Sequence, residues 1–279
     1  MKNMLSTAYR NQNFYFSKVI SKYFKKKVYL KLENQNLTGS HKDRECINLI
    51  NLAIKKKYKK IGCASTGNLA ISLAFYSKLN NLKCFIWLNK NTYINGLLKE
   101  LGAKVIVKKI SLKNLYIKSD KYFKKNKIFS TNPGSHEDKL NANRVITEEI
   151  LEKNNKNKCI VSSINNGSHL LGLSKNVKNL KFYGVYSKSK LAKSINSYSL
   201  TEVKKRGILK TLNLIKANDR EIIKGFNLLA KEGLFLDGSS CAIVGSLNKI
   251  KSKNICCVLS GSALNNLTEV QKIIFKSKN

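Results

Sequence analysis

Arginine, acidic residues and long apolar runs are all scarce in this chain of 279 residues. No apolar run approaches the roughly 20 residues that a membrane-spanning helix needs, which predicts a soluble protein with no membrane partner. The formal net charge is +37, yet only 5 basic residues are arginine and 48 are lysine, spread along the whole chain. Nucleic-acid sites cluster their basic residues and favour the arginine fork, so we expect no dedicated nucleic-acid site. The positive field would still attract an acidic or phosphorylated small substrate.

Cysteine pairs with metal-binding or redox spacing are also missing. The seven cysteines form no C-x-x-C pair and have no histidine partners at zinc-site spacing, which argues against a zinc site and against a disulfide framework. We therefore expect no metal site, and buried, reduced thiols that pack as small apolar side chains. Reduced thiols are typical of the cytoplasm, where we expect the protein to be located. The single proline, Pro133, stands in an irregular stretch and is a candidate hinge.

The sequence does contain a regular alternation of short apolar runs and longer segments with apolar residues at helical spacing. Strands are predicted at residues 28–33, 60–63, 83–88, 104–108, 158–162, 181–186 and 254–259. Helices are predicted at residues 42–55, 68–79, 94–101, 137–151, 219–231 and 240–250. This order favours an α/β fold built on largely parallel strands.

Four loops that follow predicted strands are rich in small and hydroxyl-bearing residues. They are Thr38-Gly39-Ser40, Ser65-Thr66-Gly67-Asn68, Asn165-Asn166-Gly167-Ser168 and Ser260-Gly261-Ser262. Loops after parallel strands collect at one edge of the sheet, where ligands bind, and free backbone N–H groups at a helix start can hold a phosphate or carboxylate. Each residue taken alone has a simpler interpretation as a helix cap. The four loops together favour a ligand site.

Residues 31–44 carry the most specific pattern, K-L-E-N-Q-N-L-T-G-S-H-K-D-R. It resembles the K-x-E-x-x-N-P-T-G-S-x-K-D-R segment of fold type II pyridoxal-phosphate enzymes, the tryptophan synthase β family, and departs from it at Leu37, where the family has proline. Later landmarks follow in the order of that family, at residues 64–68, 166–168, 232–234, 238–242 and 259–264. The resemblance thus extends over nearly the whole chain.

Membership of that family would imply pyridoxal 5'-phosphate as cofactor, bound covalently to Lys42. It would also imply a two-lobed, three-layer α/β fold with parallel sheets, of the tryptophan synthase β-like type. We expect residues 1–45 and 130–279 to form a large cofactor-binding lobe, and residues 46–129 to form a smaller mobile lobe.

The resemblance also implies a role for each loop. Lys42 would hold the cofactor and, once substrate releases its amine, move protons on the substrate. Asn68 would bind the phenolic oxygen of the cofactor, Ser65 and Thr66 the substrate carboxylate, and Ser260 the pyridine nitrogen. The cofactor phosphate would be held by Asn165, Asn166, Gly167, Ser168 and His169. The first and fourth of these replace glycines of the family pattern.

Within the family, the Ser-Thr-Gly-Asn loop at 65–68 and the Ser260-Gly261 pair are most similar to those of threonine synthases. This similarity implies the conversion of O-phospho-L-homoserine and water to L-threonine and phosphate, a phosphorylated amino-acid substrate and a homodimer. The candidates to hold the substrate phosphate are Asn132, Lys139 and Arg144.

The sequence is also compatible with other functions. Within the family, the alternatives are a cysteine synthase or a serine/threonine dehydratase. Outside catalysis, the chain could be a basic relative that has lost activity and binds polyanions through its positive surface. That alternative is motivated by departures from the family pattern at Leu37, Asn165, Ser168, Asn265 and Asn266.

Overall fold

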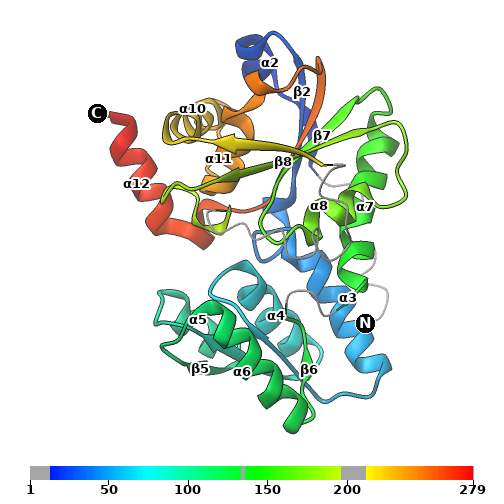
Figure 1. Cartoon of the computed structure of the whole chain (residues 1–279), viewed down its shortest axis with the longest axis vertical. Coiled ribbons are helices and arrows are strands. Elements are labelled where there is room, and N and C mark those ends of the chain that lie inside the picture. The colour runs from blue at the N-terminus through cyan, green and yellow to red at the C-terminus, as the bar shows by residue number, and fades with distance from the viewer. Residues whose placement is uncertain (1–12, 133–135, 196–211, 279) are drawn as a thin grey trace. The chain divides into compact units, whose positions relative to one another are not determined.

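The computed structural model describes residues 13–132, 136–195 and 212–278 (Figure 1). Pro133, the candidate hinge, lies outside these ranges. The chain divides into two compact units, the first made of residues 1–41 and 143–279 and the second of residues 42–142. The roles that we expect for the two lobes, cofactor binding for one and mobility for the other, stay predictions.

The first unit is built on a six-stranded sheet in which only the edge strand β1 is antiparallel to its neighbour. In spatial order the strands are β1 (Phe14–Phe16), β2 (Lys27–Leu32), β10 (Asn254–Leu259), β7 (Cys159–Ser163), β8 (Lys181–Ser187) and β9 (Asn213–Ala217). The register places Ile255 of β10 opposite Val28 on one side and Cys159 on the other. All three side chains are fully buried, as expected for a parallel sheet that is covered on both faces.

Helices cover both faces of this sheet. They are α2 (Lys18–Phe24), α7 (Asp138–Lys153), α8 (Ser168–Ser174), α10 (Asp219–Ala230), α11 (Gly238–Gly245) and α12 (Leu267–Lys278). α11 is buried along its whole length and packs against β7, β8 and β10, while α10 packs on α11. Figure 1 shows α7 and α8 on the opposite side of the sheet from α10 and α11. The first unit therefore has three layers, with its core on the two faces of the sheet.

The second unit has a smaller sheet of four parallel strands. Their spatial order is β5 (Lys104–Val107), β4 (Lys83–Leu88), β3 (Lys60–Ala64) and β6 (Phe129–Ser130). Its helices are α3 (Lys42–Lys55), α4 (Asn68–Leu79), α5 (Ile94–Glu100) and α6 (Leu112–Lys125). Gly62 of β3 lets α6 come close, because a Cβ atom there would lie 2.8 Å from the ring of Phe123. The predicted α/β fold with parallel sheets is confirmed.

Two carboxyl groups of the first unit are buried close enough for their charges to interact. Asp237 caps α11 by accepting the backbone N–H of Ser240 at 2.9 Å. Glu269 lies in the first turn of α12, is 5% exposed, and its Oε2 has no hydrogen-bond partner among the described residues. Burial, and then the charge of Asp237, raise the pKa of Glu269 to about 7. Burial raises the pKa of Asp237 to about 6.

Replacing Glu269 with glutamine is expected to stabilise the protein at about pH 8 by roughly 1–3 kcal/mol. The pKa of Glu269 in the folded protein, about 7, lies above its ordinary value of 4.5. Between pH 4.5 and about 7, Glu269 is therefore mostly protonated in the folded state and mostly ionised in the unfolded state. Stability from this group is therefore present below the unfolded pKa and lost as the pH rises through about 7. Urea unfolding measures the difference between variant and wild type, which should vanish at about pH 4. An equal effect at both pH values would contradict a buried charge as the cause.

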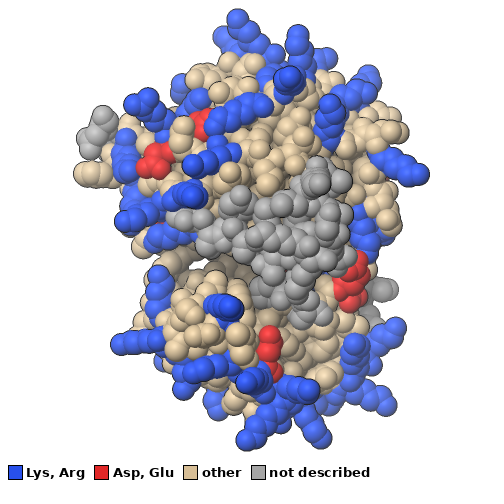
Figure 2. Space-filling model, in the orientation of Figure 1, with Lys and Arg blue, Asp and Glu red and all other residues tan. Residues whose placement is uncertain are grey.

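All seven cysteines are free and buried, which confirms the prediction of unpaired thiols in the core. Within the described ranges, no helix combines the length and the apolar character that a membrane crossing requires. Figure 2 shows lysine and arginine side chains spread over the visible face of each unit. On the described part of this face the positive charge is thus spread over both units, and the expectation about nucleic acid stays a prediction.

Candidate functional site

In the first unit, two of the predicted loops leave the sheet at the same edge. β7 ends at Ser163 and β10 at Leu259, and these strands are parallel neighbours. The residues that follow them therefore meet at the carboxyl edge of the sheet. Ser260 follows β10 directly, is 3% exposed, and has its Oγ 3.4 Å from the Oγ of Ser163. Its hydroxyl is thus held where the loop after β7 begins.

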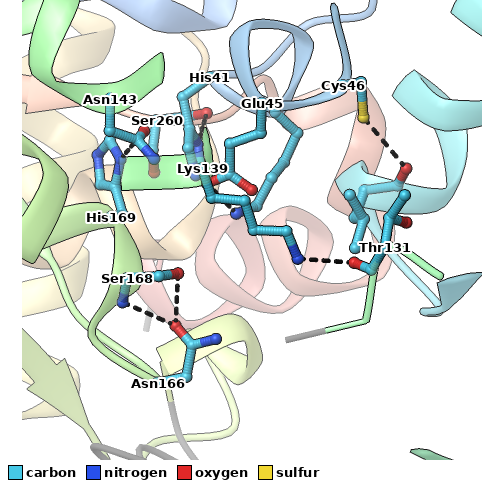
Figure 3. Close-up of polar contacts among 12 residues, drawn as sticks. His41, Glu45, Cys46, Thr131, Lys139, Asn143, Asn166, Ser168, His169 and Ser260 are labelled. Atoms are coloured by element: carbon cyan, nitrogen blue, oxygen red, sulfur yellow. Dashed lines mark hydrogen bonds and ion pairs between the residues drawn. The ribbon is translucent and has the colours of Figure 1, made fainter. Parts of the chain in front are cut away.

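The segment that precedes Lys42 is attached to the same edge. The backbone N–H of His41 donates to the carbonyl of Ser260 at 3.1 Å, and Nδ1 of its ring lies 3.2 Å from the same oxygen (Figure 3). The carbonyl of Gly39 accepts the N–H of Ser262 at 2.9 Å. These bonds fix the backbone immediately before Lys42 to the loop after β10.

Asn265, one of the departures from the family pattern, has a structural contact here. Its Nδ2 donates to the carbonyl of Thr38 at 2.9 Å. Gly39, next in the chain, has φ of +82°, and a Cβ atom there would come within 3.1 Å of that nitrogen. A left-handed residue so close to another side chain favours glycine. The Thr-Gly-Ser turn is therefore held from outside by Asn265.

The loop after β7 is a tight turn fixed by Asn166 (Figure 3). The Oδ1 of Asn166 accepts both the backbone N–H of Ser168, at 3.1 Å, and its hydroxyl, at 3.0 Å. Gly167 has φ of +100°, a conformation that glycine adopts without strain, and α8 begins at Ser168. Asn165 is exposed, whereas Ser168 is buried. The five predicted phosphate ligands are consecutive, at residues 165–169, and therefore lie on this turn and at the start of α8.

Two buried histidine rings lie at this part of the first unit. The ring centroids of His41 and His169 are 4.2 Å apart, and the rings are tilted by 42°. Nδ1 of His169 lies 2.6 Å from the Oδ1 of Asn143 on α7. His41 and Asn143 were not among the predicted site residues. His41 stands at a variable position of the 31–44 pattern and Asn143 lies outside that pattern, and the partners of both are distant in the sequence.

In the second unit, Lys42 is the first residue of α3. Its Nζ lies 2.8 Å from Oε1 of Glu45, with the lysine side chain 22% exposed and that of Glu45 only 1%. Asp43 accepts hydrogen bonds from the hydroxyls of Ser72 and Tyr76 on α4, the second at 3.1 Å. These bonds tie the first turn of α3 to α4. Asp43 also suits its place in that first turn, because the helix dipole favours carboxylates at a helix N-terminus. Lys42 is a partly exposed amine on a well-fixed helix start.

The loop 65–68 connects β3 to α4. The N–H of Ser65 donates to the carbonyl of Trp87 on β4 at 3.1 Å, and α4 begins at Asn68. Ser65 and Thr66 are half-buried. The Oδ1 of Asn68 is buried and, in the part of the chain that the structure describes, has no hydrogen-bond partner. Because an unsatisfied buried amide is costly, this oxygen marks a place for a polar ligand.

Both ends of the side-chain amide of Asn132 form hydrogen bonds within the second unit. It is 1% exposed. Its Oδ1 accepts the N–H of Ala64 at 2.7 Å, and its Nδ2 donates to Ser119 Oγ at 2.9 Å and to Asp120 Oδ1 at 2.8 Å. The side chain therefore joins the chain after β6 to the end of β3. To bind a substrate phosphate it would have to exchange these bonds, so that assignment stays a prediction.

Lys139 is also held internally. It is 3% exposed, and its Nζ donates to the carbonyls of Thr131 at 2.6 Å and Asn132 at 2.8 Å. Burial lowers its pKa to about 8, with the negative charge of Glu45 raising it and the positive charge of Lys42 lowering it further. At least two of its three N–H groups are thus occupied, and its role toward a phosphate likewise stays a prediction.

Arg144 belongs to the first unit, and its Nε lies 3.1 Å from Oε1 of Glu148. Both side chains are partly exposed, although the Nε atom itself is buried and makes no hydrogen bond within the described ranges. The structure therefore brings Asn132 and Lys139 together and gives Arg144 a separate partner. Across the described ranges, no three histidine, cysteine or acidic side chains lie close enough together to hold a metal ion.

The chain as a whole is similar to known proteins. The family described as pyridoxal-phosphate dependent enzyme matches residues 5–261. Threonine synthase of Methanocaldococcus jannaschii is 26% identical over 290 residues, covering 86% of this chain and 71% of that protein. Catabolic L-threonine dehydratase of Staphylococcus aureus is 25% identical over 283 residues, covering 88% and 82%. Threonine deaminase isoform 2 from Solanum lycopersicum shares the fold, with a TM-score of 0.80 and 17% identity over 95% of this chain and 83% of that one.

Proposed function

Because this chain belongs to the family of pyridoxal-phosphate dependent enzymes, we propose that it acts as a threonine synthase, converting O-phospho-L-homoserine and water to L-threonine and phosphate. Its cofactor is pyridoxal 5'-phosphate. The observation that carries the choice of reaction is the similarity to the Methanocaldococcus jannaschii threonine synthase over most of this chain. The Ser-Thr-Gly-Asn sequence at 65–68 and the Ser260-Gly261 pair support the same choice.

The polar groups of the predicted site fit this cofactor. The Oδ1 of Asn68 is buried without a partner in the described ranges. A half-turn of the side-chain amide exchanges Oδ1 and Nδ2, which would place the NH2 group there to donate to a phenolic oxygen. Gly167 has no Cβ atom and a left-handed backbone, which lets an anion approach the N–H groups of its loop. Ser260 offers a neutral hydroxyl to a ring nitrogen. Each of these groups, taken within its own unit, suits one contact that the cofactor would make.

When bound, the cofactor supplies an electron sink that stabilises negative charge on the substrate carbon next to the amino group. Lys42 would hold the cofactor covalently through its amine. When that amine is free, it would hold and move protons at Cα and Cβ of the substrate. The bonds from Asp43 to α4 hold the backbone of Lys42 in place.

The remaining residues bind and orient. Ser65 and Thr66 bind the substrate carboxylate through their hydroxyls and through N–H groups at the start of α4, a 12-residue helix. Ser260 binds the pyridine nitrogen, and because its hydroxyl is neutral it does not enforce a charged ring, which suits elimination more than amino transfer. The cofactor phosphate is bound by Asn165, Asn166, Gly167, Ser168 and His169.

Arg144 is the first candidate to bind the substrate phosphate. It would only have to leave a partly exposed ion pair with Glu148, and such pairs contribute little to stability. Its guanidinium offers a planar fork that matches a phosphate. Asn132 and Lys139 remain predicted ligands at the cost of their internal bonds.

Phosphate release tests the proposal directly. The purified, cofactor-loaded protein is incubated with O-phospho-L-homoserine, and inorganic phosphate and L-threonine are measured together. Equal amounts of the two products are expected. A folded, cofactor-loaded sample that releases no phosphate would show that the proposed reaction is wrong.

A dehydratase is the second candidate, favoured by the similarity to the Staphylococcus aureus threonine dehydratase over most of both chains. Such an enzyme converts L-threonine or L-serine to a 2-keto acid and ammonia without releasing phosphate. Supplying these two amino acids to the same sample, and O-acetylserine with sulfide as a test for cysteine synthase, distinguishes the three activities by their products.

A further inference from the structure

A buried carboxylate in the second unit faces two lysine side chains. Oε1 of Glu45 is 2.8 Å from Nζ of Lys42, and the side chain of Glu45 is 1% exposed. Its charge also acts on Lys139, whose pKa it raises against the effect of burial. Figure 3 shows the side chains of Glu45 and Lys139 next to each other. One negative charge is thus shared by two positive ones.

The two lysines differ in how they are held. Lys139 is 3% exposed, and the carbonyls of Thr131 and Asn132 fix its ammonium independently of Lys42. Lys42 is 22% exposed and stands at the first position of its helix. Lys139 is therefore the fixed cation of the group, and Lys42 is the one with room to move.

Other ionisable groups near this cluster contribute little charge or are already bonded. The thiols of Cys46 and Cys63 act on Lys139 only when ionised, and burial raises the pKa of both well above its ordinary value. Asp43 is bonded to hydroxyls of α4. Of the groups that act on Lys139, Glu45 and Lys42 are therefore the two that carry charge near neutral pH.

We propose that Glu45 is a positioning residue for Lys42: its carboxylate anchors the lysine amine whenever that amine is not bonded to the cofactor, while Lys139 remains near Glu45 as a second positive charge. The inference rests on the proposed role of Lys42. A buried carboxylate that lost its only cation would be strongly destabilising. Lys139 prevents that loss when Lys42 leaves, and Glu45 gives the released amine a defined place to return to.

Glu45 and Lys139 should act on Lys42 in opposite directions. A carboxylate beside an amine favours the ammonium form, which cannot attack an aldehyde or accept a proton. A neighbouring ammonium favours the neutral form, which can do both. Neutralising Glu45 should therefore make Lys42 more reactive, and neutralising Lys139 should make it less reactive.

Acetylation of the full-length protein measures this reactivity. After the cofactor has been removed with hydroxylamine, a short pulse of isotope-labelled succinimidyl acetate is given near neutral pH, and each lysine is quantified by mass spectrometry. Glu45→Gln is expected to raise the acetylation rate of Lys42 by more than about twofold, because the amine loses the buried carboxylate that lies 2.8 Å from it. Lys139→Gln is expected to lower it by roughly threefold. If Glu45 and Lys139 had only structural roles, the two substitutions would not change the acetylation rate of Lys42 in opposite directions.

Lys276 and Asp219 provide the matched control. Their pair has nearly the same length, 2.9 Å, but the side chains are 53% and 46% exposed. Solvent weakens such a pair, so Asp219→Asn should change the acetylation of Lys276 by less than about twofold.

Two results would overturn the inference: acetylation of Lys42 in folded Glu45→Gln within twofold of wild type, or a change of the same sign in both variants. If Glu45→Gln does not fold, Lys139→Gln decides, since slower acetylation supports the inference and an unchanged rate overturns it. Borohydride reduction of the wild-type holoenzyme separates this from the proposed function. An adduct away from Lys42 counts against the proposed function, whereas an adduct on Lys42 with unaltered acetylation counts against the role of Glu45 alone.

Discussion

Lys42→Ala is expected to abolish the covalent link to the cofactor and to lower turnover by at least about a thousandfold. Alanine has no amine to bond to the cofactor, and it leaves no group to hold the proton that must leave the substrate. The wild-type protein should be yellow, and borohydride should fix the cofactor to Lys42. The visible spectrum with and without borohydride, peptide mapping of the reduced adduct, and phosphate release from O-phospho-L-homoserine measure the three effects.

Two control variants separate chemistry from folding. Lys42→Arg keeps a cation beside Glu45, but a guanidinium stays protonated and does not form the bond, so it should be as inactive as the alanine variant and nearly as stable as wild type. Lys55→Ala, in the last turn of the same helix, should change neither colour nor activity. A reduced adduct on another lysine would contradict the assignment. A colourless wild-type protein with salt-sensitive RNA binding would instead support the non-catalytic, polyanion-binding alternative.

The elements that the sequence predicted well are those with a strong and local pattern. α3 and α4 begin and end where the apolar spacing predicted, at Lys42–Lys55 and Asn68–Leu79. The strand Asn254–Leu259 is a continuous apolar run that is buried on both faces, and it too was predicted at its observed bounds. Local signals were sufficient for these elements. In the two helices, apolar residues recur at the helical period, and in the strand they form one short unbroken run.

Other elements were missed for identifiable reasons. β6 has only two residues, Phe129–Ser130, too few to show a period. α6 buries a narrow stripe of Leu115, Ser119 and Phe123, in which a serine interrupts the apolar pattern. α11 is buried on all sides and so has no polar face to mark its ends, which is why the predicted helix 240–250 extends beyond Gly245.

The candidate site also contains residues that the sequence predicted and residues that it did not. The motif placed Lys42, Gly167 and Ser260 on the loops and helix starts where the structure has them, because these positions follow from chain order. The partners of these residues did not follow from it. Glu45 faces Lys139, 94 positions further along the chain by their numbers, and only packing brings the two together. The internal bonds of Lys139 were unpredictable for the same reason, since a surface lysine and a buried one look alike in the sequence.

Gly245→Ala is expected to destabilise the first unit by at least about 3 kcal/mol and to lower its melting temperature by roughly 6–12 °C. α10 and α11 cross with their backbones in contact. A Cβ atom on Gly245 would lie 1.7 Å from the carbonyl oxygen of Glu221, and one on Gly225 would lie 1.9 Å from that of Cys241. Neither contact involves a flexible side chain, so the helices would have to separate. Because α11 packs directly on β7, β8 and β10, separating it from α10 would also disturb the core beneath.

Gly96→Ala is the matched control, since Gly96 lies within the helix α5, is exposed, and an added Cβ atom there would meet nothing within 4 Å. The same chemical change should stabilise the protein by about 0.5–1 kcal/mol, because alanine favours the helix and has fewer unfolded conformations than glycine. Thermal unfolding followed by circular dichroism compares the two variants. The same glycine-to-alanine substitution is therefore expected to lower the stability at position 245 and to raise it at position 96. A Gly245→Ala protein that unfolds within about 1 kcal/mol of wild type would mean that α10 and α11 do not cross at these glycines.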